Sequence, residues 1–246
     1  MPAPQPFPDG SVPLLHVANL TKLYGRDELA IERVMFSVQA GEILGIIGPN
    51  GAGKTTVLEA IAGLLPVNSG EVFWRGEPLK IADRRNSLFY LPDGVHPYRD
   101  QTAWQVLSFV ARVFRRSDAE VRATIEALGL QPVLGKRVHE LSKGYARRLI
   151  LSLGLLAPHE LLLMDEPFDG FDLRQIREII GVLRGQTAYG RTLILCIHQL
   201  ADAERICDRF ILLSAGRVRG IGGLADLRAQ TGLATGSLED IFLALT

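Results

Sequence analysis

A glycine-rich segment, residues 48–56, contains the side chains best suited to phosphate chemistry. It fits the pattern G-x-x-x-x-G-K-[ST], with Gly48, Gly53, Lys54 and Thr55 at the fixed positions. Glycine allows positive φ and lets backbone N–H groups approach phosphate oxygens closely. Lys54 can reach the β- and γ-phosphates of a nucleotide, and the Thr55 hydroxyl can bind Mg²⁺. The other predicted phosphate-binding residues of the segment are Asn50, Gly51, Ala52 and Thr56.

The sequence on either side of this segment can position it. The apolar run Ile43–Ile47 has the length and β-branching of a buried strand, and an apolar helical pattern covers residues 57–62. A helix that starts at the loop points its positive dipole end toward bound phosphate. An ordinary strand-to-helix turn that needs glycine is the alternative interpretation.

A second apolar run, residues 161–164, ends in two carboxylates, Asp165 and Glu166. In a phosphate-loop fold, such a strand lies beside the loop strand, and its terminal Asp can hold the Mg²⁺ that Thr55 also binds. Glu166 is then placed to orient or deprotonate an attacking water. Two solvated acids that cap a strand are the alternative.

A predicted helix begins at Ser142, 23 residues before Asp165. Ser142 is a natural N-cap, and Gly144 leaves the backbone uncovered. This segment is either a simple helix start or a second phosphate-binding element, made of a hydroxyl and helix-end N–H groups.

Composition and charge limit the classes of function. The chain has 246 residues, is 47% hydrophobic, and balances 27 basic with 27 acidic residues, so it is globular and no nucleic-acid partner is expected. The spacing of Cys196 and Cys207 is not that of a metal site, so we expect reduced, buried thiols. No apolar run approaches the roughly 18 residues of a membrane span. Residues 1–13 are predicted to be a disordered or extended proline-rich arm.

The remaining pattern predicts strands that alternate with helices, and therefore a mostly parallel sheet. The segment from about 102 to 157 has helical periodicity, with helices near 104–114, at 118–128 and after Ser142. It interrupts the strand pattern as a helical insert. Further strands are predicted at 14–20, 31–38, 72–75, 87–91, 193–197 and 210–213, with a turn at 68–71.

Several motifs in order resemble those of ATP-binding cassette (ABC) ATPases over about residues 14–220. Residues 48–56 resemble the family's phosphate loop, and Leu141–Tyr145 resembles its signature sequence. Residues 161–166 are similar to the strand that carries the Mg²⁺ aspartate and the catalytic glutamate, and residues 168–172 to the loop that follows it. His198 matches the family's switch histidine, and Tyr24 resembles the aromatic residue that stacks on adenine.

This resemblance implies an α/β fold: a P-loop NTPase core with a mostly parallel sheet, an antiparallel β-subdomain and an inserted helical signature subdomain. It implies one ABC ATPase domain over residues 14–246. The nucleotide-binding core covers about 14–92 and 159–220, the helical subdomain about 93–158, and a C-terminal closing segment 221–246.

The resemblance also implies ATP and Mg²⁺ as ligands, with Asp165 and Thr55 on the metal and Glu166 and His198 in catalysis. Two such cassettes stack head to tail. Ser142 and Gly144 of one cassette then complete the ATP site of the other.

The sequence departs from the family pattern at a few positions. Asp93 replaces the usual Gln after the strand at 87–91; its carboxylate either holds Mg²⁺ or water, or is only a turn residue in Pro-Asp-Gly. Lys143 and Phe168 replace smaller residues in the signature and in the dimer-contact loop. The arginines at 112, 115, 116, 147 and 148 are interpreted as solvated helix faces, with contact to anionic lipid as the alternative.

Most single cassettes without a membrane span resemble the ATPase subunit of a two-component transporter. That implies a separately encoded transmembrane permease, a second ATPase subunit (identical or different), and a place on the cytoplasmic face of the inner (plasma) membrane. Residues 236–243 look like the tail of exporter-type members, so export is favoured over import. The alternatives are a soluble ABC ATPase in translation or DNA maintenance, and a phosphate-loop kinase or GTPase.

Overall fold

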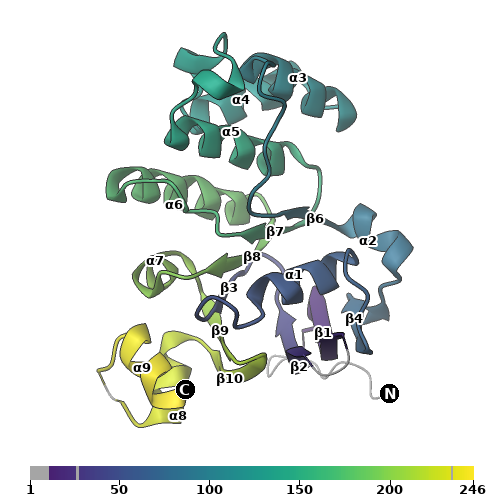
Figure 1. The fold of residues 1–246 in the computed structure, drawn as a ribbon, viewed down its shortest axis with the longest axis vertical. Helices are drawn as coiled ribbons and strands as arrows, with labels where there is room; N and C mark the ends of the chain where they lie inside the picture. Colours follow the sequence, from purple (N-terminus) through teal and green to yellow (C-terminus); the bar gives the residue numbers. More distant parts are fainter. Residues whose placement is uncertain (1–10, 26–27, 234) are drawn as a thin grey trace.

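The computed structural model describes residues 11–25, 28–233 and 235–246. Within these ranges the strands form a larger and a smaller sheet (Figure 1). The larger one is mostly parallel, with the spatial order β10-β9-β3-β8-β7-β6, and only β10 runs antiparallel to its neighbour. Its strands are β3 (Ile43–Ile47), β6 (Leu88–Leu91), β7 (Leu161–Asp165), β8 (Thr192–Ile197), β9 (Arg209–Ser214) and β10 (Arg217–Gly222).

The central strand β3 is buried on both faces, which explains its unbroken apolar sequence. Its side chains alternate between two cores because successive residues of a strand point to opposite faces. Leu44 and Ile46 pack in the core that holds α1 (Lys54–Ala62), whereas Ile43 and Ile47 pack in the core that holds most of the other helices.

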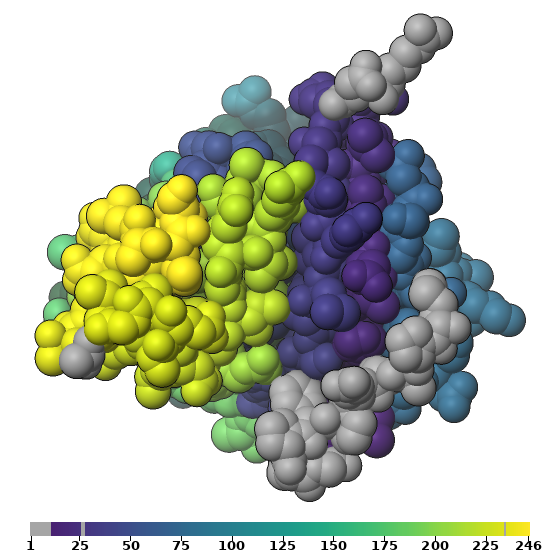
Figure 2. All heavy atoms as spheres, turned by 90° about the horizontal axis from the view of Figure 1, so that it is seen from below, coloured from purple at the N-terminus to yellow at the C-terminus, as the bar shows by residue number. Residues whose placement is uncertain are grey.

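The smaller sheet is antiparallel and has the order β2-β1-β4-β5. Helix α1 packs against this sheet and the larger one. Figure 2 shows β10 beside the second strand of the chain, where the N–H of Glu32 donates to the carbonyl of Gly216 at 2.8 Å. The strands are β1 (Leu15–Tyr24), β2 (Glu28–Val38), β4 (Ser69–Trp74) and β5 (Glu77–Pro78).

A helical segment lies above the larger sheet in Figure 1 and consists of α3 (Ala103–Val113), α4 (Asp118–Ala127) and α5 (Lys143–Leu156). Each helix starts after a hydroxyl side chain that accepts a backbone N–H: Thr102, Ser117 and Ser142 respectively. The remaining helices are α2 (Ile81–Ser87), α6 (Leu173–Ala188), α7 (Leu200–Ile206), α8 (Leu224–Thr231) and α9 (Leu238–Leu245).

The predicted fold class is confirmed, with local corrections. Residues 69–71, predicted as part of a turn, belong to β4, because Ser69 and Glu71 pair with Thr21 and Ala18 of β1. Helix α2 was not predicted, since only Arg84 among its seven residues is buried and no apolar period marks it. The proposed domain boundaries stay a prediction, and residues 1–10 of the predicted arm lie outside the described ranges.

Both cysteines are buried and unpaired, as predicted. Burial raises the pKa of each thiol, because a thiolate would lose its hydration in the core. Among the described residues, none of the helices has the length and apolar character needed to cross a membrane.

Candidate functional site

The glycine-rich loop connects β3 to α1 and adopts a conformation that requires glycine. Gly53 has φ of 102°, and a Cβ at this position would lie 2.6 Å from the carbonyl oxygen of Ala30. Gly51 has φ of 79° with open space beside it. The loop therefore exposes backbone where a phosphate can approach, next to the N-terminus of α1.

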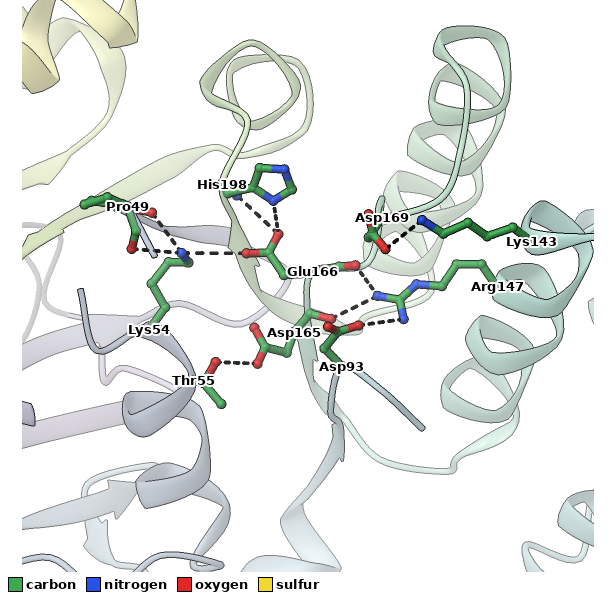
Figure 3. A network of polar contacts seen from close by, with 11 residues as sticks. Pro49, Lys54, Thr55, Asp93, Lys143, Arg147, Asp165, Glu166, Asp169 and His198 are labelled. Atoms are coloured by element: carbon green, nitrogen blue, oxygen red, sulfur yellow. Dashed lines mark hydrogen bonds and ion pairs between the residues drawn. The ribbon is translucent and has the colours of Figure 1, made fainter. Parts of the chain in front are cut away.

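Lys54 is the first residue of α1 and is only 6% exposed. Its ammonium group donates to the carbonyl of Gly48 at 2.8 Å and to that of Pro49 at 3.3 Å, and it lies 3.6 Å from Glu166 Oε1 (Figure 3). The cation is thus held directly over the loop that is predicted to bind phosphate.

Asp165 ends β7 and meets Thr55, the second residue of α1. The Thr55 hydroxyl donates to Asp165 Oδ2 at 2.7 Å, while buried Asp165 Oδ1 has no hydrogen-bond partner among the described residues. Desolvation raises the pKa of Asp165, and the neighbouring charge of Glu166 adds to this, whereas the Thr55 hydrogen bond opposes it. A hydroxyl and an unpartnered carboxylate oxygen fit Mg²⁺, which prefers oxygen ligands and takes the rest from water and substrate phosphates.

The Asp165→Asn variant should unfold at higher temperature than the unmodified chain at pH 7, although it would lose its metal ligand. The native chain binds the Asp165 proton more tightly than the unfolded chain, whose pKa is near 3.8. The free energy of unfolding therefore falls as pH rises from about 3.8 through the raised native pKa. We expect the gain in the absence of added metal to be present at pH 7 and to shrink as pH falls toward 3.8, where the Asp165 carboxyl of the native chain is protonated.

Thermal unfolding between pH 4 and pH 8 measures this effect. Asp100→Asn is the control, because the Asp100 side chain is 87% exposed. Equal unfolding temperatures for the Asp165→Asn variant and the unmodified chain across this range would contradict the prediction.

Glu166 follows β7 in the left-handed conformation, with φ of 48°, which is unfavourable for a residue with a side chain. Its N–H donates to the carbonyl of Cys196 at 3.0 Å. Its Oε2 accepts from His198 Nδ1 at 2.6 Å and from the His198 backbone N–H at 3.3 Å, at the end of β8. The carboxylate therefore lies between the Lys54 ammonium and the His198 imidazole (Figure 3).

One open cavity of about 440 Å³ gathers most of the predicted site. Its lining includes Tyr24, residues 49–56, Asp93, Asp165 and Glu166. Two further predicted residues contact this lining: the carbonyl of Gly48 accepts from Lys54, and His198 contacts Glu166. Sequence reasoning missed Glu28, Leu29 and Ala30, which also line the cavity; strand pattern alone did not show that β2 begins beside the phosphate loop.

Ser142 and Gly144 are not part of this cavity lining. Ser142 is exposed at the start of α5, where its hydroxyl accepts the N–H of Tyr145 at 3.3 Å. Gly144 is buried against Gln175 of α6. The structure therefore does not bring the signature segment into the chain's own phosphate site.

The interpretation of Arg116, Arg147 and Arg148 as solvated was wrong. The Arg116 side chain is 16% exposed and donates to the carbonyl of Leu156 at 2.6 Å. Arg147 is 8% exposed and forms an ion pair of 3.2 Å with Asp93. Arg148 donates to the carbonyl of Leu128 at 3.0 Å and to Glu178 at 2.6 Å. Helical spacing could have revealed this, because Gly144, Arg147 and Leu151 are three and four residues apart and share a buried face.

Comparisons with known proteins agree with this geometry. The ABC transporter family profile matches residues 31–169. The ABC-type transporter ATP-binding protein EcsA of Bacillus subtilis (strain 168) is 31% identical over 239 residues, 95% of this chain and 96% of that protein. Nod factor export ATP-binding protein I of Rhizobium meliloti (strain 1021) is 37% identical over 82% of this chain and 62% of that protein. A solved ATP-binding subunit of an ABC transporter is 33% identical with a TM-score of 0.84, covering 94% of this chain and 99% of its own.

Proposed function

Because the chain belongs to the ABC transporter family, whose ATP-binding proteins are ATPases, we propose that it powers a membrane transporter by hydrolysing ATP in the cavity at the carboxyl ends of β3 and β7. The observation that carries this proposal is the placement of Glu166 between Lys54 and His198, beside the Thr55–Asp165 pair. A cation that binds phosphate, a pair of metal ligands and a general base then lie side by side.

Each residue of the cavity has a role in this proposal. Backbone N–H groups of residues 50–56 and the Lys54 ammonium bind the phosphates, and Tyr24 stacks on the adenine. Thr55 and Asp165 hold Mg²⁺, which neutralises charge on the phosphate oxygens when bound. Asp93 remains a weaker candidate for this metal, since its carboxylate is paired with Arg147.

The reaction transfers the γ-phosphoryl group to water. Glu166 accepts a proton from the water as its oxygen attacks the γ-phosphorus, and the bond between the γ-phosphorus and the bridging oxygen breaks to release ADP and phosphate. His198 orients the Glu166 carboxylate through its 2.6 Å contact, and from this position it would contact the γ-phosphate of bound ATP.

A second cassette would complete the site. Ser142 and Gly144 of one subunit bind the ATP of its partner, which agrees with their position outside their own cavity. Helix α5 then presents its N-terminal N–H groups to the partner's phosphates. The partner is either a second copy of this chain or a related ATPase.

The Ser142→Arg variant should lose ATP-dependent dimerisation. The large cation at an exposed position blocks the opposing surface, and the lost cap of α5 costs only about 1 kcal/mol. Size-exclusion chromatography with ATP, in the Glu166→Gln background, measures the dimer. Ser117→Arg is a matched control because Ser117 is also an exposed helix cap, on α4. Equal dimer fractions for both variants would contradict the head-to-tail arrangement.

ATP-binding proteins of ABC transporters work with transmembrane components. We place this chain on the cytoplasmic face of the inner membrane, bound to a separately encoded permease. Export is favoured over import by two observations: the relative from Rhizobium meliloti is named for Nod factor export, and residues 236–243 resemble the tail of exporter-type members.

Affinity purification of the tagged chain from mild detergent, followed by mass spectrometry, tests the transporter assignment. A multi-span membrane protein at a near one-to-one ratio supports it. Recovery of ribosomal or DNA-maintenance proteins without any membrane protein would contradict it and favour the soluble ATPase.

A further inference from the structure

Arg147 contacts two segments that are far from each other in the sequence. One guanidinium nitrogen donates to Asp93 Oδ1 at 3.2 Å, in the loop after β6. A second guanidinium nitrogen donates to the carbonyl of Asp165 at 3.2 Å and to the carbonyl of Glu166 at the end of β7 (Figure 3). Arg147 itself belongs to α5, five residues after the Ser142 cap.

The bond to the Glu166 carbonyl bears on the geometry of the general base. Glu166 has the left-handed φ of 48°, a conformation that persists only when its surroundings hold it. Its N–H donates to the carbonyl of Cys196, and its carbonyl accepts from Arg147 and from the N–H of Asp169 at 3.2 Å, so both backbone polar groups of this residue have partners. This backbone conformation directs the carboxylate toward Lys54 and His198.

Burial makes the contact specific for arginine. The Arg147 side chain is 9% exposed, and a buried cation needs a counter-charge, which Asp93 provides. A planar guanidinium can donate to several acceptors at once, whereas a lysine ammonium is a single point charge. Asp93, which replaces the usual Gln, is thereby explained as the anionic partner of Arg147.

We infer that Arg147 is a positioning residue for Glu166, and that the Asp93–Arg147 pair connects the signature helix α5 to the general base of the same chain. This inference rests on the proposed role of Glu166 in hydrolysis. A shift of α5 against the larger sheet would change the hydrogen bond between Arg147 and the Glu166 carbonyl. Contact of the α5 N-terminus with a partner's ATP would in this way act on the hydrolysis of the chain's own ATP.

The test compares Arg147→Gln with Arg191→Gln in the full-length chain. Arg191 is a matched control because its guanidinium donates to three oxygens, those of Leu155, Ala157 and Gln186, at the opposite end of α5. Amide hydrogen exchange is measured on peptides that contain residues 165–171. We expect exchange there to be roughly tenfold faster in Arg147→Gln and unchanged in Arg191→Gln.

ATP turnover is measured on the same proteins. Arg147→Gln should lower kcat about 10- to 100-fold while KM and ATP affinity stay within about twofold, because the base is misplaced and the phosphate loop is intact. Arg147→Lys keeps the charge and should fail to restore kcat. Adding Asp93→Asn to Arg147→Gln should cause little further loss of kcat, since both substitutions remove the same contact between the two residues.

Unchanged exchange at residues 165–171 in Arg147→Gln would overturn the inference, and so would full activity of Arg147→Lys. If Arg147→Gln does not fold, Arg147→Lys and Asp93→Asn supply both readouts, and wild-type exchange at residues 165–171 in these two variants overturns the inference. An unmodified chain that binds ATP but does not hydrolyse it would refute the proposed function instead, and hydrogen exchange would still report on the Arg147 contact.

Discussion

The Glu166→Gln variant should bind ATP with nearly unchanged affinity and lose hydrolysis by about 100- to 10,000-fold, the usual contribution of a general base. Gln has the shape of Glu but does not accept a proton from water. The phosphate loop, Lys54 and Thr55 are untouched by this change. The variant should therefore accumulate as a closed, ATP-bound dimer.

Two measurements check this result: phosphate release under steady state, and the dimer fraction by light scattering with and without ATP. Glu160→Gln is the control, because Glu160 precedes the same strand β7 at its opposite end and pairs with Arg75. Turnover in Glu166→Gln within a few fold of Glu160→Gln would remove Glu166 from the mechanism.

Replacing Lys54 by Ala should weaken ATP binding by about 10- to 100-fold, which corresponds to roughly 1.5–3 kcal/mol for a hydrogen bond to a charged group. The ammonium already lies over the loop, bonded to the carbonyls of Gly48 and Pro49. In Lys54→Ala, the phosphates lose this cation in a site where water screens charge poorly.

Titration with a fluorescent ATP analogue measures this affinity, and circular dichroism confirms that the variant is folded. Lys80→Ala is the control at an exposed position before α2. An unchanged dissociation constant for Lys54→Ala would show that Lys54 does not contact the nucleotide.

Much of the site was predictable because its residues lie in local motifs. The loop at 48–56 and the pair at 165–166 each follow a buried apolar run. The sequence therefore shows both the strand and the functional residues that lie at its end. Parallel pairing then brings the ends of these strands to one edge, and the structure has Thr55 in contact with Asp165.

The Asp93–Arg147 pair was not predictable in the same way. Its members are 54 residues apart, and each has an ordinary local explanation, a turn residue and a charged helix face. Only the packing of α5 against the end of β7 makes the arginine a buried donor. Helical spacing places Arg147 on the buried face of α5, but it does not identify Asp93 and the carbonyl of Asp165 as its partners, because these contacts form only in the tertiary structure.

The position of β3 in the larger sheet affects when the site can assemble during synthesis. This strand ends at residue 47, yet its neighbours β8 and β9 end at residues 197 and 214. A nascent chain therefore carries the whole phosphate loop long before the strands that flank it leave the ribosome. In the helical segment, α3 and α4 both contact α5 within a stretch of 54 residues, so these helices can associate before β8 and β9 have been synthesised. The phosphate loop is thus synthesised early, whereas the nucleotide site is complete only after β8 and β9 have been synthesised.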